Sequence, residues 1–139
     1  MKERIALIEI AVGTIYSNIQ DEIKERAAER DKFTTITQQY RIDGAPYFFA
    51  TLTGNGIWVV GDPMTFEVAF SMAIHGENVW TADPLDIYAL ACAVGAYSGY
   101  GVYGPEQGNR YSKCWHYHLK RGNQKHTTHF FFGYENVEF

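Results

Sequence analysis

Four of the five histidines in the chain fall between residues 116 and 129, and their spacing could support chemistry. His116 and His118 are two residues apart, so a strand would place both imidazoles on one face. A paired strand could bring His126 or His129 opposite them. Three neutral imidazoles suit zinc with one coordination position left open. The spacing therefore raises a metal-site hypothesis, to be weighed against surface or stacked histidines that bind no ion.

Two features weigh against a metal at these histidines. Cys114 is the only thiol nearby, and no carboxylate occurs from Asn109 through Gly133. The stretch thus offers no acidic partner that would orient the rings. No nucleophile elbow or phosphate-binding loop occurs elsewhere in the chain. We therefore expect no metal ligand, no catalytic residue and no cofactor, and the sequence favours a protein without enzymatic activity.

The same histidines leave two alternative functions open. The segments H-Y-H and H-T-T-H are similar to the paired His-x-Thr elements of two-histidine phosphodiesterases, although residues 116–118 carry no hydroxyl at the matching place. One alternative is therefore a metal- or histidine-dependent phosphodiesterase or other hydrolase that acts on a nucleotide. The other is a protein that sequesters a nucleotide messenger in an aromatic pocket, since aromatic residues make up 16% of the chain.

Length and charge limit the class of protein. A chain of 139 residues predicts a single domain over residues 1–139. Twelve Lys and Arg against 16 Asp and Glu give a net charge of -4, which disfavours direct binding of nucleic acid. No apolar run reaches the ~18 residues of a membrane span. With two cysteines and no cleavable leader, we expect a cytoplasmic protein that does not bind membranes.

The first half of the chain predicts a helix followed by a sheet. Residues 3–30 have the apolar spacing of one amphipathic helix. Four strands, over 35–42, 47–52, 57–60 and 65–74, are predicted to form an antiparallel meander, with turns at Asp43-Gly44 and at residues 54–56. The strand over 65–74 has the most regular alternation: Phe66, Val68, Phe70, Met72, Ile74.

The second half predicts a buried helix and a hairpin. Asp83 is placed as the N-cap and Pro84 as the first residue of a helix over 84–97. Residues 98–110 contain four glycines and are predicted to form a loop. Residues 111–120 fit a strand or a helix; as a strand they would pair with 126–134 as a C-terminal β-hairpin. The expected fold class is therefore α+β.

Several short motifs occur in the order found in a known family. The aromatic segment 47–58 contains a Gly-Asn-Gly turn, Thr81-Ala82 precedes an Ala-rich helix that ends in Ala-Tyr-Ser, and residues 115–119 read W-H-Y-H-L. Ile15-Tyr16-Ser17 supplies an earlier motif. Over roughly residues 14–120 the chain resembles the antirestriction proteins of the ArdB/KlcA family. Segment 33–42 and the tail H-F-F-F-G-Y have no counterpart there.

The resemblance implies a small cytoplasmic α+β protein with which a phage or plasmid counters type I restriction in the host cell. Such a protein acts without being an enzyme and without imitating DNA. Its partner would be a host defence protein or a small nucleotide ligand, and a homo-oligomer is compatible with the sequence. We expect the partner- or ligand-binding surface at the loop 99–110 and the segment that follows it. The residues assigned to it are Tyr100, Tyr103, Arg110, Trp115, His116 and His118.

Overall fold

The computed structural model describes residues 20, 21, 24, 26–108 and 113–139, and the chain divides into two compact units, residues 1–34 and 35–139. Each unit is described by itself. Most of the predicted helix over 3–30 lies outside the described residues; of its length, residues 20, 21, 24 and 26–30 are helical. Along the described parts of the chain, no helix is long and apolar enough to cross a membrane.

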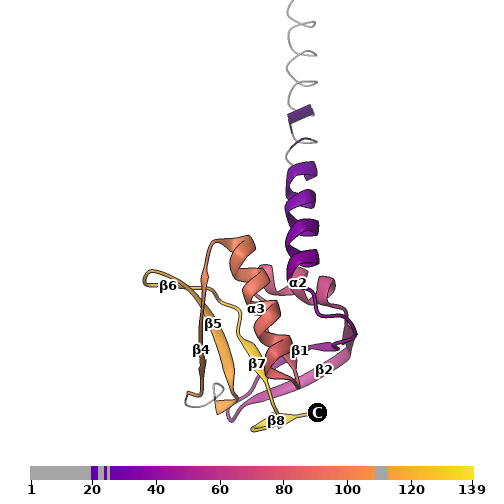
Figure 1. The fold of residues 1–139 in the computed structure, drawn as a ribbon. Helices are drawn as coiled ribbons and strands as arrows, with labels where there is room; N and C mark the ends of the chain where they lie inside the picture. Colours follow the sequence, from indigo (N-terminus) through magenta and orange to yellow (C-terminus); the bar gives the residue numbers. More distant parts are fainter. Residues whose placement is uncertain (1–19, 22–23, 25, 109–112) are drawn as a thin grey trace, which may run out of the picture. The chain divides into compact units, whose positions relative to one another are not determined.

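The second unit has an α+β fold, as predicted, built on a curled sheet of eight strands (Figure 1). The strands are β1 (Tyr47–Leu52), β2 (Ile57–Met64), β3 (Val79–Thr81), β4 (Gly101–Glu106), β5 (His116–Arg121), β6 (Gln124–Lys125), β7 (Phe130–Phe132) and β8 (Val137–Glu138). Their order is β4-β5-β7-β3-β1-β2-β8, and β6 pairs with β5. The β1–β2 hairpin and the antiparallel pairing of β5 with β7 confirm the sequence prediction. Because β3–β7 and β2–β8 are parallel, the sheet is mixed and not a simple meander.

Helix α3 (Pro84–Ser98) confirms the predicted buried helix. The Asp83 carboxylate accepts a hydrogen bond from the Leu85 N–H at 2.7 Å, which satisfies one of the unpaired donors of the first turn. Gly99 ends the helix in the left-handed conformation, with a φ of 78°. The helix lies against β3, β4, β5 and β7, and the sheet curls around it (Figure 1).

The predicted strand over 65–74 is wrong, because these residues form helix α2 (Phe66–Ile74). Its buried residues follow a helical spacing: Phe66, Ala69, Phe70, Ala73. The Thr65 hydroxyl caps the helix by accepting from the Val68 N–H at 3.3 Å. Val68 itself is 49% exposed. The small alanines allow close packing, so they face the core although the alternation placed them on the polar side.

The predicted strand over 35–42 is also wrong, because residues 26–40 are helical. Within the second unit, positions 36, 37 and 40 are the less exposed ones of this helix, whereas 35, 38 and 39 are exposed. The less exposed positions thus follow the spacing of a helix, and not the two-residue alternation of β-branched residues that predicted a strand. Asp43 and Gly44 do form a turn, but it leads from the helix into β1 and does not join two strands.

The two faces of the sheet differ in what covers them. Residues opposite each other on neighbouring strands share a face. One row runs through Phe48, Trp80, Phe131 and His116. The other row runs through Phe49, Val79, Phe130 and Tyr117. Tyr117 contacts Tyr88 of α3, with 5.3 Å between the ring centroids, so α3 covers the second row. The histidines of β5 therefore lie on the face turned away from α3.

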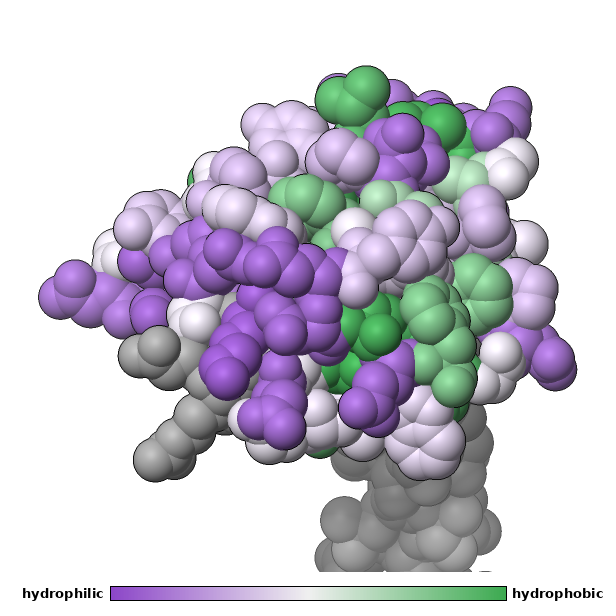
Figure 2. Space-filling model, turned by 90° about the horizontal axis from the view of Figure 1, so that it is seen from below, coloured by the Kyte–Doolittle hydropathy of each residue, from purple (hydrophilic) through white to green (hydrophobic). Residues whose placement is uncertain are grey.

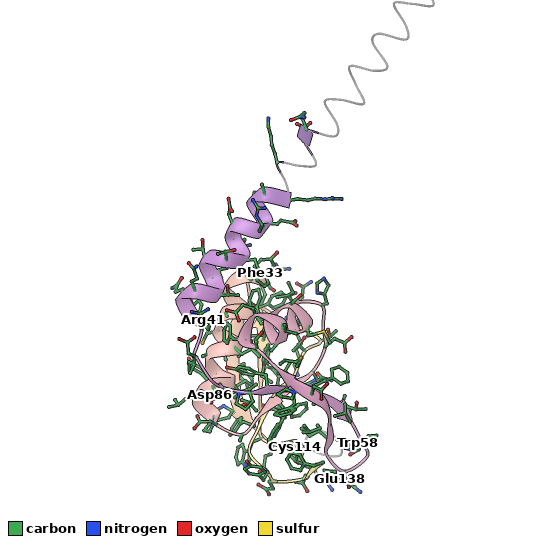
Figure 3. The ribbon with its side chains drawn as sticks, turned by 90° about the vertical axis from the view of Figure 1, so that its right-hand side faces the viewer. Phe33, Arg41, Trp58, Asp86, Cys114 and Glu138 are labelled. Atoms are coloured by element: carbon green, nitrogen blue, oxygen red, sulfur yellow. The ribbon has the colours of Figure 1, made fainter. Side chains whose placement is uncertain are left out.

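A cluster of buried side chains lies next to His116 on the face of the sheet that is turned away from α3. Its members are Ala50, Ile57, Val59, Trp80, Cys114 and Phe131. The Trp80 indole donates to the Gly133 carbonyl at 2.7 Å, and the Cys114 thiol donates to the Asn136 carbonyl at 3.1 Å. Cys114 lies at the same end of the unit as Trp58 and Glu138 (Figure 3), which are partners across β2 and β8. These contacts fix the chain that enters β5.

Candidate metal centre

Three ligand-type side chains from β4 and β5 converge on one point. The His118 Nε2 lies 2.7 Å from the Glu106 Oε1 and 2.9 Å from the His116 Nε2. The His116 Nε2 lies 3.7 Å from the same Glu106 oxygen. Both imidazoles are buried, and Glu106 is 38% exposed. The structure thus brings together the two predicted histidines and a carboxylate that the sequence prediction did not include.

An irregularity in β4 puts Glu106 in this position. Tyr103 is the partner of His118, and Glu106 is the partner of His116, so three residues of β4 span two residues of β5. Without the extra residue, Pro105 would stand opposite His116 and Glu106 would point to the other face. Gly104 allows the irregularity, since its φ is 120° and a Cβ there would lie 3.1 Å from the His116 carbonyl oxygen. Residues 101–106 are therefore a strand that shapes the site, and the predicted loop over 98–110 is wrong for this part.

The hydrogen bonds of His116 determine which of its nitrogens faces the site. The His116 Nδ1 lies 2.7 Å from the Cys114 carbonyl oxygen, which can only accept, so Nδ1 carries the proton. The Nε2 of neutral His116 therefore presents a lone pair to His118 and Glu106. A backbone carbonyl thus orients this ring, in the role for which the sequence prediction had sought a carboxylate.

The Glu106 oxygen and the two imidazole nitrogens could hold a metal ion, because each residue offers one ligand atom and these atoms lie within 4.8 Å of one another. Without an ion, a single hydrogen on the His118 Nε2 must serve both the Glu106 carboxylate and the His116 lone pair. Burial lowers the pKa of His118, the neighbouring His116 lowers it further, and Glu106 opposes both effects. A metal ion with bonds of about 2.0–2.1 Å holds its ligand atoms about 2.9–3.4 Å apart. Of the three distances between the ligand atoms, 2.7 Å is shorter than this range, 2.9 Å lies at its lower limit and 3.7 Å is longer. Small side-chain shifts would bring all three distances within the range.

His129 stands beside the three ligands as a fourth titratable group. Its ring centroid is 4.9 Å from that of His118. The Asn78 side-chain oxygen accepts from the His129 backbone N–H at 2.8 Å and lies 3.1 Å from its Nδ1, which places the ring proton on Nδ1. Burial, together with the nearby His118 and His116, lowers the pKa of His129 to about 4. A pKa of about 4 keeps this imidazole neutral at pH 7, so its Nε2 can accept a proton as a weak base.

A cavity of about 510 Å³ opens beside this cluster. It is lined by Glu106, His116, His118, Lys125, His126 and His129, with Gly108 and Thr127. Burial lowers the pKa of His126, which keeps this imidazole neutral at pH 7 as well. A volume of this size is typical of a site for a small molecule. The four histidines of the sequence hypothesis therefore line one cavity.

The other predicted site residues lie around the cavity or outside the described chain. Tyr103 is 47% exposed, and the Lys120 ammonium lies 3.6 Å from its ring centroid. Tyr100 contacts His126, with ring centroids 5.4 Å apart. Trp115 is 37% exposed and precedes β5. Arg110 lies outside the described residues.

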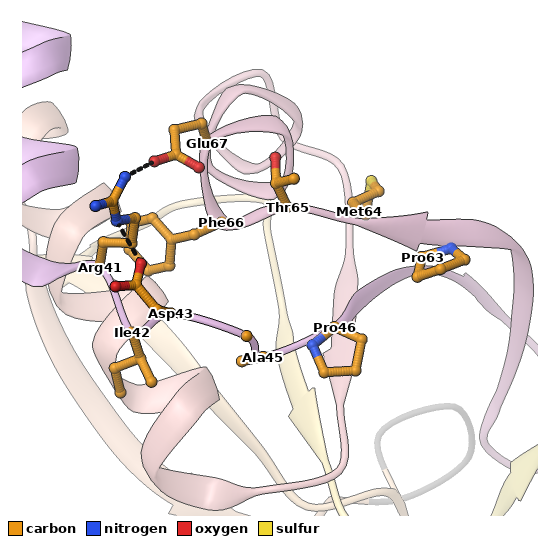
Figure 4. Close-up of a pocket in the computed structure, with 11 residues that line it drawn as sticks. Arg41, Ile42, Asp43, Ala45, Pro46, Pro63, Met64, Thr65, Phe66 and Glu67 are labelled. Carbon is orange, nitrogen blue, oxygen red and sulfur yellow. Dashed lines mark hydrogen bonds and ion pairs between the residues drawn. The ribbon is translucent and has the colours of Figure 1, made fainter.

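A second cavity, of about 330 Å³, lies between the turn after residue 40 and the start of α2 (Figure 4). Arg41 donates to Glu67 at 3.1 Å and lies 2.9 Å from the Asp43 carboxylate. The hydrogen bond to Glu67 and the charge of Asp43 raise the pKa of Arg41. Because two carboxylates already neutralise this guanidinium, the cavity is a weaker candidate for an anion.

Figure 2 shows the lower end of the molecule, where a compact group of hydrophobic side chains is bordered by hydrophilic ones.

Comparison of the chain with protein-family models, with curated proteins and with solved structures found no match. The resemblance to the ArdB/KlcA family therefore stays a prediction that rests on the short motifs quoted above.

Proposed function

We propose that this chain is a zinc-dependent hydrolase whose metal is held by Glu106, His116 and His118. The convergence of these three side chains is the observation that carries the proposal. Two imidazoles and one carboxylate are a ligand set of hydrolytic zinc centres, in which water takes the fourth position. The cavity beside the ligands supports an open position, because a closed structural site would need no such space.

The proposed chemistry uses His129 as the base. Zinc lowers the pKa of a bound water to about 7. Zinc held by Glu106, His116 and His118 would in this way supply a nucleophile, and His129 would take up a proton as the water oxygen bonds to the electrophilic centre of an ester. The new bond to the water oxygen forms as the bond to the leaving alcohol breaks, and the proton on His129 passes to that alcohol. Water and ester are thereby converted to acid and alcohol, and the base is regenerated.

Metal uptake and ester hydrolysis by the full chain test this proposal. Chelator-treated protein should bind one equivalent of zinc and should then hydrolyse a chromogenic p-nitrophenyl ester. The Glu106→Gln variant should bind zinc at least tenfold more weakly and lose the activity, since the amide carries no charge. Glu77→Gln, an exposed change in the turn after α2, is the matched control and should behave like the unaltered chain. Equal zinc binding by the two variants, or no zinc uptake at all, would contradict the proposal.

A second candidate function, counter-defence by binding a host protein, follows from the family resemblance. One observation favours a binding surface: the exposed Tyr103 ring carries the Lys120 ammonium over its face. Tyrosine rings are enriched at protein interfaces.

Alanine at Tyr100 and Tyr103 together should remove this surface. In a plating assay of restricted phage on cells that express the chain, the double variant should fail to protect the phage. Its melting temperature should stay close to that of the unaltered chain, because Tyr103 is exposed and Tyr100 is half-buried at the surface. If protection survives, the binding surface lies elsewhere; if the unaltered chain gives no protection, the counter-defence function is wrong.

A further inference from the structure

Lys125 gives the cavity at the candidate metal centre a positive charge of its own. Among the described residues that line the cavity, it alone carries a formal positive charge, and Glu106 alone carries a negative one. Lysine is a common point-charge ligand for phosphate.

The neighbouring lysine of the same hairpin provides a contrast. Lys120 and Lys125 are direct partners across β5 and β6, so they share one face of the sheet. Lys120 places its ammonium over the Tyr103 ring and does not line the cavity. Two lysines of equal charge thus lie side by side, and only one of them faces the candidate site.

We propose that the cavity binds the phosphate group of a phosphate monoester, with one phosphate oxygen on the metal and another on Lys125. This inference rests on the proposed function. A divalent metal and Lys125 together bring three positive charges, and Glu106 removes one. The remaining charge of two matches a phosphate dianion and exceeds the single charge of a carboxylate. In the reaction, the water oxygen bonds to phosphorus, the bond to the ester oxygen breaks, and the alcohol leaves with a proton.

Binding of inorganic phosphate to the cobalt-loaded full chain tests this inference. Cobalt takes the same ligands as zinc, and its visible absorption reports a change in coordination. The first step is titration of chelator-treated protein with Co²⁺ alone. The second step is titration of the loaded protein with phosphate and, separately, with acetate. Both steps are repeated on Lys125→Gln and on Lys120→Gln, which remove the same charge at neighbouring positions.

Phosphate should change the cobalt spectrum at lower concentration than acetate. Lys125→Gln should weaken phosphate binding about tenfold with cobalt affinity unchanged, because a charge-assisted contact is lost. Lys120→Gln should bind phosphate within twofold of the unaltered chain. The inference is overturned if cobalt binds but phosphate leaves the spectrum unchanged, if acetate binds as tightly, or if both lysine variants respond alike. Failure to take up cobalt would instead contradict the proposed function, and the inference with it.

Discussion

Zinc at a thousandfold excess over its dissociation constant should raise the free energy of unfolding of this chain by about 4 kcal/mol. The native state brings Glu106, His116 and His118 together from two strands, and the unfolded chain does not. A ligand that binds only the native state stabilises it by mass action. Denaturant unfolding with zinc and with chelator, followed by circular dichroism, measures the difference.

His118→Ala should abolish nearly all of this stabilisation. The His118 Nε2 is the atom closest to both of the other ligands, so its loss leaves only two ligand atoms, 3.7 Å apart. His75→Ala is the matched control, because His75 lies at the end of α2 and is exposed. This control should keep the full effect of zinc. If zinc stabilises both variants equally, the ion binds elsewhere and the candidate metal centre is wrong.

The sequence predicted the two histidines of β5 because their environment is local. His116 and His118 alternate with Tyr117 and Leu119 in a strand bounded by a turn, and a two-residue period needs no knowledge of distant contacts. The capped helix α3 could be predicted for the same reason: Asp83, Pro84 and Gly99 are local signals at its two ends.

Glu106 could not be predicted in the same way. Its place opposite His116 depends on one extra residue in β4, and a pairing register is a property of two strands. Four glycines made residues 98–110 resemble a loop, although one of them, Gly104, has the positive φ that allows the extra residue in β4. A carboxylate ten residues before a His-x-His pair is the signal that could have suggested Glu106.

The two strands that proved helical show a different limit. The prediction of a strand over 65–74 relied on the alternation of large apolar residues and left out Ala69 and Ala73. These two residues have little hydrophobic area, but their small size fits a close helix contact. The Thr65 cap was the competing signal in the sequence. Burial of small residues depends on what packs against them, so composition alone could not decide between strand and helix.

Acidification from pH 7 to pH 5 should lower the free energy of unfolding of the metal-free chain by about 2 kcal/mol through His129 alone. The native pKa of His129 is about 4, against an ordinary value of 6.5. The unfolded chain therefore binds more protons than the native chain between these two values, and stability rises with pH there. The loss begins as the pH falls below 6.5 and is complete below pH 4. His118 changes stability in the same direction, because its pKa is also lowered.

His129→Gln should flatten this pH dependence, since glutamine stays neutral at every pH and can still donate a hydrogen bond to Asn78. Denaturant unfolding in chelator at a series of pH values between 4.5 and 7.5 measures the slope. His75→Gln removes an exposed histidine and should leave the slope unchanged. If His129→Gln loses stability in acid as steeply as the unaltered chain, protons enter at another group. The protonation of these histidines also sets the conditions for metal binding, because only neutral imidazoles can act as ligands. The burial that makes acid destabilising thus keeps His118 and His129 neutral at pH 7, where one can bind an ion and the other can accept a proton.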